Sequence, residues 1–198
     1  PFEDIKAQIE AELGSALADV YESFDEKPLA TASIGQVHRA TLKTPSGVVD
    51  VVVKVQRSGC KDIIERDVDL LYWLARAVER SIPEARLYHP VRVVEEFDRS
   101  IMAELDYVEE ADNCDVFRRN FEGNRGVVFP VVYRDCSSKR VLTLSYLNGH
   151  KIYEAIRNGM SGEVIARRAI QVIVQQVFED GFFHADPHPG NIIMMGDA

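Results

Sequence analysis

Residues 37–55 read V-H-R-A-T-L-K-T-P-S-G-V-V-D-V-V-V-K-V, in which two apolar runs flank the turn sequence Thr44-Pro45-Ser46-Gly47. β-Branched residues favour strands, and Pro with Gly between two such runs is typical of a tight connection. We therefore predict two antiparallel strands, over 37–42 and 48–55. The second strand carries one basic side chain, Lys54, after the apolar run Val51-Val52-Val53.

Helical patterns lie on both sides of this hairpin. Apolar residues recur every three or four positions over 2–24, which predicts an amphipathic helix that Gly14 divides and Pro28 closes. The same period over 61–82 predicts a second helix, and Pro83 ends it. The chain thus places helix, hairpin and helix in succession.

The second half of the chain alternates helical and β-rich segments. A helical period continues from about 91 to 121, and the β-rich runs 127–133 and 140–147 predict a second hairpin. Residues 164–178 are apolar nearly all round, which predicts a buried helix. A short strand is expected over 192–195, and it ends at Gly196-Asp197-Ala198.

Composition excludes several classes of protein. With 198 residues, 46% of them hydrophobic and 28% charged, the chain is typical of a folded domain. Cys60, Cys114 and Cys136 form no C-x-x-C pair, so we predict no zinc ribbon and no thioredoxin-like motif. The net charge of -9 argues against nucleic-acid binding. Eight acidic and two basic residues fall within 1–29, where an acidic helix face is expected.

The loop His184-Ala185-Asp186-Pro187-His188-Pro189-Gly190-Asn191 is the most specific local feature. Kinase catalytic loops read H-R-D-x-x-x-x-N, with an aspartate that accepts the substrate proton and an asparagine that binds magnesium. Asp186 and Asn191 have this spacing. Two alternatives are a polar loop that merely ends a helix, and a hydrolase metal site formed by His184, Asp186 and His188. Pro187 and Pro189 disfavour the metal site.

Lys54 supports the kinase interpretation of the 184–191 loop. Its surroundings, V-V-V-K-V, match the kinase pattern V-A-I-K, whose lysine reaches the nucleotide phosphates. The alternative is a lysine that faces solvent from a strand. Gly35 lies 19 residues earlier, where a kinase has its glycine-rich loop, but this loop has one glycine instead of three.

Four motifs together carry a family resemblance: S-I-G-Q-V-H at 33–38, V-K-V-Q-R at 53–57, E-L-D-Y-V-E-E-A at 104–111 and F-H-A-D-P-H-P-G-N at 183–191. On these, residues 2–195 resemble the UbiB family of atypical, protein-kinase-like proteins, also called AarF-domain proteins. The resemblance implies an α+β, protein-kinase-like, two-lobed fold with a β-rich N-lobe, inserted helices and a partial helical C-lobe. It implies a helical extension over 1–29, an N-lobe with a helical insertion over 30–147, and the start of the C-lobe over 148–198.

The resemblance also implies roles for single residues. Lys54 would anchor the phosphates and pair with Glu110, Asp186 would be the catalytic base and Asn191 the magnesium ligand. Glu104 and Asp106 match the family's E-x-D motif. Spacing alone does not choose Glu110 over Glu65 as the partner of Lys54, and choosing Glu110 makes the 61–82 helix an insertion. The nucleotide-binding loop would comprise Leu29, Ala30, Thr31, Ala32, Ser33, Ile34, Gly35, Gln36 and Val37.

The implied function is ATPase or small-molecule kinase activity with ATP or ADP and magnesium, in support of isoprenoid-quinone (ubiquinone) or lipid metabolism. The implied partners are a lipid or isoprenoid-quinone precursor and quinone-biosynthesis proteins. The implied location is the cytoplasmic face of a bacterial membrane, a mitochondrion or a plastid, and we expect attachment only through parts outside these residues. Two alternatives are a non-catalytic nucleotide-sensing module and an aminoglycoside- or choline-type kinase, whose likeness is confined to the 184–191 loop.

Two departures from the family pattern bear on activity. The K-x-G-Q and D-F-G motifs do not occur in the 198 residues, so we expect a piece cut at both ends that is a weak or inactive catalyst on its own. The alanine-rich loop restricts backbone freedom and adds bulk beside a nucleotide. We therefore expect nucleotide binding with poor transfer to a protein substrate, which Ala32→Gly would alter.

Overall fold

The computed structural model describes residues 1–124, 126–186 and 188–196. Pro187 of the loop, and Asp197 and Ala198 after the predicted last strand, lie outside this description. The chain divides into two compact units. The sheet unit comprises Pro1–Asp112 and Val132–Leu144, and the second unit comprises Asn113–Val131 and Ser145–Ala198.

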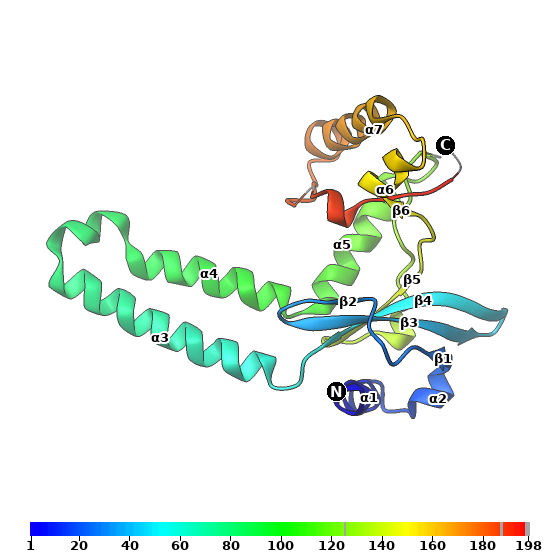
Figure 1. Cartoon of the computed structure of the whole chain (residues 1–198). Coiled ribbons are helices and arrows are strands. Elements are labelled where there is room, and N and C mark those ends of the chain that lie inside the picture. Colours follow the sequence, from blue (N-terminus) through cyan, green and yellow to red (C-terminus); the bar gives the residue numbers. More distant parts are fainter. Residues whose placement is uncertain (125, 187, 197–198) are drawn as a thin grey trace. The chain divides into compact units, whose positions relative to one another are not determined.

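The sheet unit is built on the predicted hairpin. Strands β3 (Gly35–Thr44) and β4 (Gly47–Gln56) pair antiparallel, with Val37 opposite Lys54 and Thr44 opposite Gly47. The prediction is confirmed, and both strands extend beyond the predicted ends. The sheet order is β1-β3-β4-β5, and β2 also pairs with β3 (Figure 1). The remaining strands are β1 (Tyr21–Phe24), β2 (Ala30–Thr31) and β5 (Val141–Ser145).

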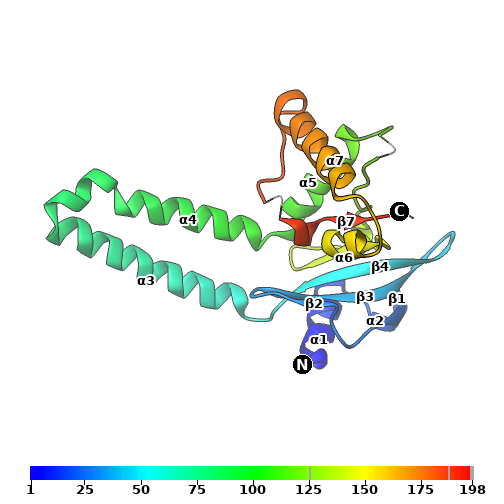
Figure 2. The same cartoon turned by 45° about the horizontal axis from the view of Figure 1, so that its top comes forward.

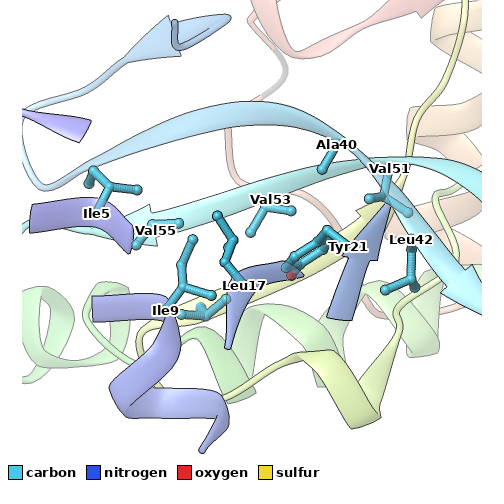
Figure 3. Packing of buried hydrophobic residues seen from close by; sticks show 10 residues of the cluster. Ile5, Ile9, Leu17, Tyr21, Ala40, Leu42, Val51, Val53 and Val55 are labelled. Carbon is cyan, nitrogen blue, oxygen red and sulfur yellow. The ribbon is translucent and has the colours of Figure 1, made fainter. Parts of the chain in front are cut away.

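One face of this sheet packs on the N-terminal helices. Val51, Val53 and Val55 are completely buried, and Ile5 and Ile9 of α1 (Phe2–Leu13) pack against them (Figure 3). Burial of one such side chain stabilises a fold by about 1.5–3 kcal/mol. Because successive strand residues point to opposite faces, Lys54 points away from this core.

The N-terminal helix is shorter than predicted. Gly14, with a φ of 66°, caps α1, so the predicted division at Gly14 is confirmed. A short helix α2 (Leu17–Val20) follows, but Tyr21–Phe24 forms β1 and not the last helical turn. The reason is tertiary, because the open edge of β3 offers backbone partners to these residues.

A helical hairpin follows β4. Helix α3 (Cys60–Ser81) confirms the helix predicted over 61–82, and a 3-10 segment (Pro83–Tyr88) leads into α4 (Pro90–Glu104). Helices α3 and α4 lie side by side (Figures 1 and 2), and the Tyr72 hydroxyl of α3 donates to Asp98 Oδ2 of α4 over 3.2 Å.

The continuous helix predicted over about 91–121 is wrong. The chain leaves the helix after Glu104, and α5 (Tyr107–Asn120) begins after two intervening residues. Asp106 Oδ1 accepts a hydrogen bond of 3.0 Å from the Val108 amide, as an N-cap residue does. A new helix start therefore interrupts the apolar period.

The second unit contains the end of α5 and the C-terminal elements. These are β6 (His150–Lys151), α6 (Ile152–Arg157), α7 (Gly162–Val174), a π turn (Gln175–Glu179), a 3-10 turn (Pro189–Asn191) and β7 (Ile193–Met194). The short strand expected over 192–195 is confirmed, since β7 pairs antiparallel with β6. Four aromatic rings pack together within this unit, those of Phe117, Phe121, Phe129 and Phe182.

The second predicted hairpin is reduced to one strand. Residues 140–147 contain β5, but 127–133 form no strand and contribute one isolated bridge, Val132 to Leu144. Pro130 has no amide hydrogen to donate to a ladder, which explains the interruption.

Helix α7 and the π turn are not buried as predicted. Ile165 is buried, but Ile170 is 61% and Phe178 81% exposed. The described residues supply too little surface to cover an all-round apolar helix. In the described part of the chain, no helix combines the length and apolar character needed to cross a membrane.

Candidate nucleotide and catalytic-loop site

Lys54 and Glu110 form an ion pair in the sheet unit. Lys54 Nζ lies 2.5 Å from Glu110 Oε2, and the side chains are 29% and 44% exposed. Glu65, the alternative partner, instead lies 3.6 Å from Lys61 on its own helix. The structure thus brings together the two residues that the motifs selected, although they are 56 positions apart.

Asp106 sets the start of the helix that carries Glu110. Besides capping α5, its Oδ2 atom lies 3.3 Å from Lys139 Nζ. The sequence Asp106-Tyr107-Val108-Glu109 has the spacing of a capping box, a signal that could have predicted the break. Glu104 is the exposed last residue of α4, so the two acidic residues of E-x-D lie on either side of the break.

Gln56 fixes this break to the sheet. It is almost completely buried, and its Nε2 atom donates to the Leu105 carbonyl over 2.5 Å. The Tyr107 amide donates to the Lys139 carbonyl over 3.0 Å. The motif V-K-V-Q-R therefore contains Lys54 and, two residues later, Gln56, which positions the start of α5.

The alanine-rich loop is a tight β connection. Ala30 pairs with Val37 and Thr31 with Gln36, and the Ala32 amide donates to the Gly35 carbonyl over 2.8 Å. No residue of 30–37, all of them described, has a positive φ. Alanine side chains therefore cost this loop no backbone strain, although they do limit its freedom to change shape. Leu29 is exposed, and its amide donates to the Val37 carbonyl.

Gly35 is required by packing. A Cβ atom at this position would lie 2.7 Å from the Val55 carbonyl oxygen and 2.8 Å from the Tyr107 hydroxyl. No side chain fits there without movement of the strand. Tyr107 is in the E-L-D-Y motif, but sequence reasoning gave it no role, since a buried aromatic residue reads as ordinary core.

The 184–191 loop brings Asp186 and Asn191 together in the second unit. Asn191 Nδ2 donates to Asp186 Oδ2 over 3.0 Å, and both side chains are exposed. An amide that donates through Nδ2 keeps its Oδ1 as an acceptor, the atom type that binds hard cations such as magnesium.

The loop is anchored by the π turn before it. Gln176 is buried, and its Oε1 atom accepts a hydrogen bond of 3.1 Å from the His184 amide. The His184 ring stacks near Phe117. π turns within helices are frequent at functional sites. Gln176 is a second residue that sequence reasoning missed, because its apolar surroundings predicted only a buried helix.

The metal-hydrolase alternative finds no support in these contacts. His184 Nδ1 accepts from the Asp186 amide, and His188 Nδ1 accepts from the Gly190 amide. Across residues 1–124, 126–186 and 188–196, no three His, Cys, Asp or Glu side chains come close enough together to hold a metal ion. The loop geometry is thus built by backbone contacts to the histidines.

Comparisons with known proteins match the whole chain. The family model "ABC1 atypical kinase-like domain" matches residues 1–198. A protein of Aliivibrio fischeri named "Probable protein kinase UbiB" is 43% identical over 195 residues, which is 97% of this chain and 36% of that protein. A protein of the same name from Pseudomonas fluorescens is 43% identical over 201 residues, 98% of this chain and 37% of that protein.

A solved structure shows the same fold. It is titled "The complex structure of Rv3197-erythromycin from Mycobacterium tuberculosis", and it superposes with a TM-score of 0.78 at 28% identity, over 98% of this chain and 48% of that one. The predicted α+β, kinase-like fold is therefore confirmed. The chain spans about a third of the length of the curated relatives that it matches.

Proposed function

Because the chain belongs to the family of ABC1 atypical kinase-like domains, we propose that it binds ATP or ADP with magnesium and catalyses transfer of the terminal phosphoryl group to water or to a small molecule. The observation that carries this proposal is the Lys54–Glu110 ion pair. Protein kinases anchor the nucleotide phosphates with a lysine that a helix glutamate holds in place. The two residues are 56 positions apart, so the fold and not sequence proximity brings them into contact.

Each side chain has a chemical task in this proposal. Lys54 neutralises phosphate charge, and Glu110 keeps its ammonium group in place. The Asp186 carboxylate accepts the proton of the attacking hydroxyl or water, and the hydrogen bond from Asn191 orients it. Asn191 would hold magnesium through Oδ1, and the bound cation would neutralise charge on the phosphates.

The biological setting follows from the relatives. Their shared name, "Probable protein kinase UbiB", supports a role in isoprenoid-quinone or lipid metabolism. We therefore propose a lipid or isoprenoid-quinone precursor as the phosphoryl acceptor or effector, with quinone-biosynthesis proteins as partners.

Phosphate release from ATP tests the catalytic part. We expect the full-length protein to show magnesium-dependent release that falls at least about 100-fold in Asp186→Asn, since a positioned base contributes about 10²–10⁴-fold. Glu163→Gln is the matched control, because Glu163 is an exposed carboxylate of the same unit that pairs with Arg167. Equal release by Asp186→Asn and the wild type would exclude Asp186 as the base.

A second candidate is a nucleotide-sensing module without turnover. The observation that favours it is the closed alanine-rich connection, whose Ala32 amide is already bonded to Gly35. Tight nucleotide binding by the wild type with no phosphate release would support this candidate over the enzyme.

A further inference from the structure

Tyr107 carries an unpaired hydroxyl group in the middle of the proposed nucleotide site. Its side chain is completely buried, and Tyr107 Oη has no hydrogen-bond partner among the described residues. Tyr21, the other deeply buried tyrosine of the sheet unit, shares a hydrogen bond of 2.9 Å with Thr143 Oγ1. A buried hydroxyl that has lost water without gaining a partner is unfavourable, and such groups are uncommon in native proteins.

The neighbours of Tyr107 are the parts of the site that would bind phosphate. Lys54 Nζ lies over its ring, 4.6 Å from the centroid, in a cation–π contact. Its hydroxyl faces Gly35, so closely that a Cβ there would lie 2.8 Å away. One side chain thus contacts both the anchor lysine and the alanine-rich loop.

The hydroxyl is a hydrogen-bond donor under all ordinary conditions. Burial, and after it the negative charge of Glu110, raise the pKa of the Tyr107 phenol well above its ordinary value. The group therefore keeps its proton and cannot serve as a base.

Gly35, the residue that the hydroxyl faces, carries a carbonyl group that can accept a hydrogen bond. At present it accepts from the Ala32 amide over 2.8 Å. If a nucleotide phosphate accepts the hydrogen bond of the Ala32 amide, the Gly35 carbonyl loses this donor. The Tyr107 hydroxyl, which lies against Gly35, is then available as a replacement donor.

We propose that Tyr107 is a positioning residue for the nucleotide: its ring supports the Lys54 ammonium group, and its hydroxyl donates to the Gly35 carbonyl when phosphate binds the Ala32 amide. This inference rests on the proposed function, because it requires a phosphate in the 30–37 loop. It explains why a tyrosine, and not a phenylalanine, occupies a site where the hydroxyl is unpaired without ligand.

Tyr107→Phe tests the hydroxyl alone. A titration with a fluorescent ADP analogue and magnesium should show about fivefold weaker binding, the loss typical of one neutral hydrogen bond. The melting temperature without nucleotide should not fall, because the phenylalanine removes an unpaired polar group. Tyr21→Phe is the matched control, and it should lower the melting temperature while leaving nucleotide affinity within about twofold, since its hydroxyl is already paired.

Two results would overturn the proposal: Tyr107→Phe that binds nucleotide as tightly as the wild type, or Tyr107→Phe that loses as much thermal stability as Tyr21→Phe. Lys54→Ala in the same titration separates this proposal from the proposed function. If Lys54→Ala weakens binding and Tyr107→Phe does not, only the role of Tyr107 fails. If the wild type binds no nucleotide, or Lys54→Ala binds equally well, both fail.

Discussion

At the scale of the residue, the proposed nucleotide site depends on close packing beneath the 30–37 loop. Gly35 has the Val55 carbonyl and the Tyr107 hydroxyl within 3 Å of the place a Cβ would occupy. The backbone of Val55 is part of the central strand and cannot give way cheaply. The loop is thus fixed to the strand that carries Lys54.

Gly35→Ala should therefore destabilise the protein. We expect a loss of about 1–3 kcal/mol in the free energy of unfolding, as for other overpacked positions, measured by urea denaturation. Gly162→Ala is the matched control, because its nearest neighbour is 3.7 Å away and it begins a helix. Equal stability of Gly35→Ala and the wild type would contradict the packing that we describe.

Tyr21 makes stability depend on alkaline pH. Burial raises the pKa of Tyr21 to about 12 from its ordinary value of 10, against a smaller lowering by its Thr143 hydrogen bond. The folded protein therefore holds a proton that the unfolded chain releases above about pH 10. The contribution of Tyr21 to stability is constant below that pH and falls as the pH rises toward 12, by up to about 1.4 kcal/mol per pH unit.

Tyr21→Phe should remove this part of the decline. Its free energy of unfolding should be lower than that of the wild type at pH 8, because the Thr143 hydrogen bond is lost, and the two curves should converge toward pH 12. Chemical denaturation across pH 8–12 measures both. Parallel curves would show that the Tyr21 phenol titrates alike in the folded and unfolded states.

At the scale of the element, the start of α5 determines where Glu110 lies. Asp106 caps this helix, and Gln56 holds the preceding Leu105 carbonyl. Glu110 follows the cap by four residues, about one helical turn, so its direction toward Lys54 is fixed by the cap.

Asp106→Ala should destabilise the protein by about 1 kcal/mol, and Asp106→Asn should do so less, because asparagine also caps helices. Urea denaturation of the two variants measures the difference. Asp50→Ala is the control, since Asp50 forms an exposed ion pair with Arg39 and such pairs contribute little. If the alanine and asparagine variants have equal stability, capping by Asp106 is not what begins the helix.

The same elements show what sequence could and could not predict. Runs rich in β-branched residues around Pro45 and Gly47 predicted β3 and β4, because the composition and the turn agreed. The break at Leu105-Asp106 was missed because the apolar period continues across it, although the cap signal was present. Tyr21–Phe24 became a strand because the edge of β3 pairs with it, which local periodicity does not encode.

The residues of the candidate site also divide into those that the sequence predicted and those that it did not. The motifs pointed to Lys54, Glu110, Asp186 and Asn191, and the contacts within each unit join them in pairs. Tyr107 and Gln176 could not be found from sequence. The importance of Tyr107 lies in a hydroxyl without a partner among the described residues, and that of Gln176 in a side chain that holds a loop.

At the scale of the whole molecule, a nucleotide that binds the folded protein must also stabilise it. At a free concentration 100 times its dissociation constant, the gain is about 2.7 kcal/mol. We expect the melting temperature to rise with ATP and magnesium in calorimetry, and EDTA to reverse part of the rise. An unchanged melting temperature at saturating nucleotide would contradict a specific site.

The net charge of -9 means that an anionic nucleotide would depend on individual cations such as Lys54. An acidic protein attracts an anionic ligand through particular cations and not through its overall charge. Lys43, on the same hairpin, is a more exposed cation that pairs with Glu22 and donates to the Ala18 carbonyl. The two lysines differ in whether a helix glutamate holds them beside the 30–37 loop.

The most direct test is an equilibrium titration of the wild type, Lys54→Ala and Lys43→Ala with a fluorescent ADP analogue in the presence of magnesium. The phosphate-anchor role predicts at least about tenfold weaker binding by Lys54→Ala, as for loss of a charge-assisted contact, and unchanged binding by Lys43→Ala. Equal affinities for the wild type and Lys54→Ala would contradict the central claim.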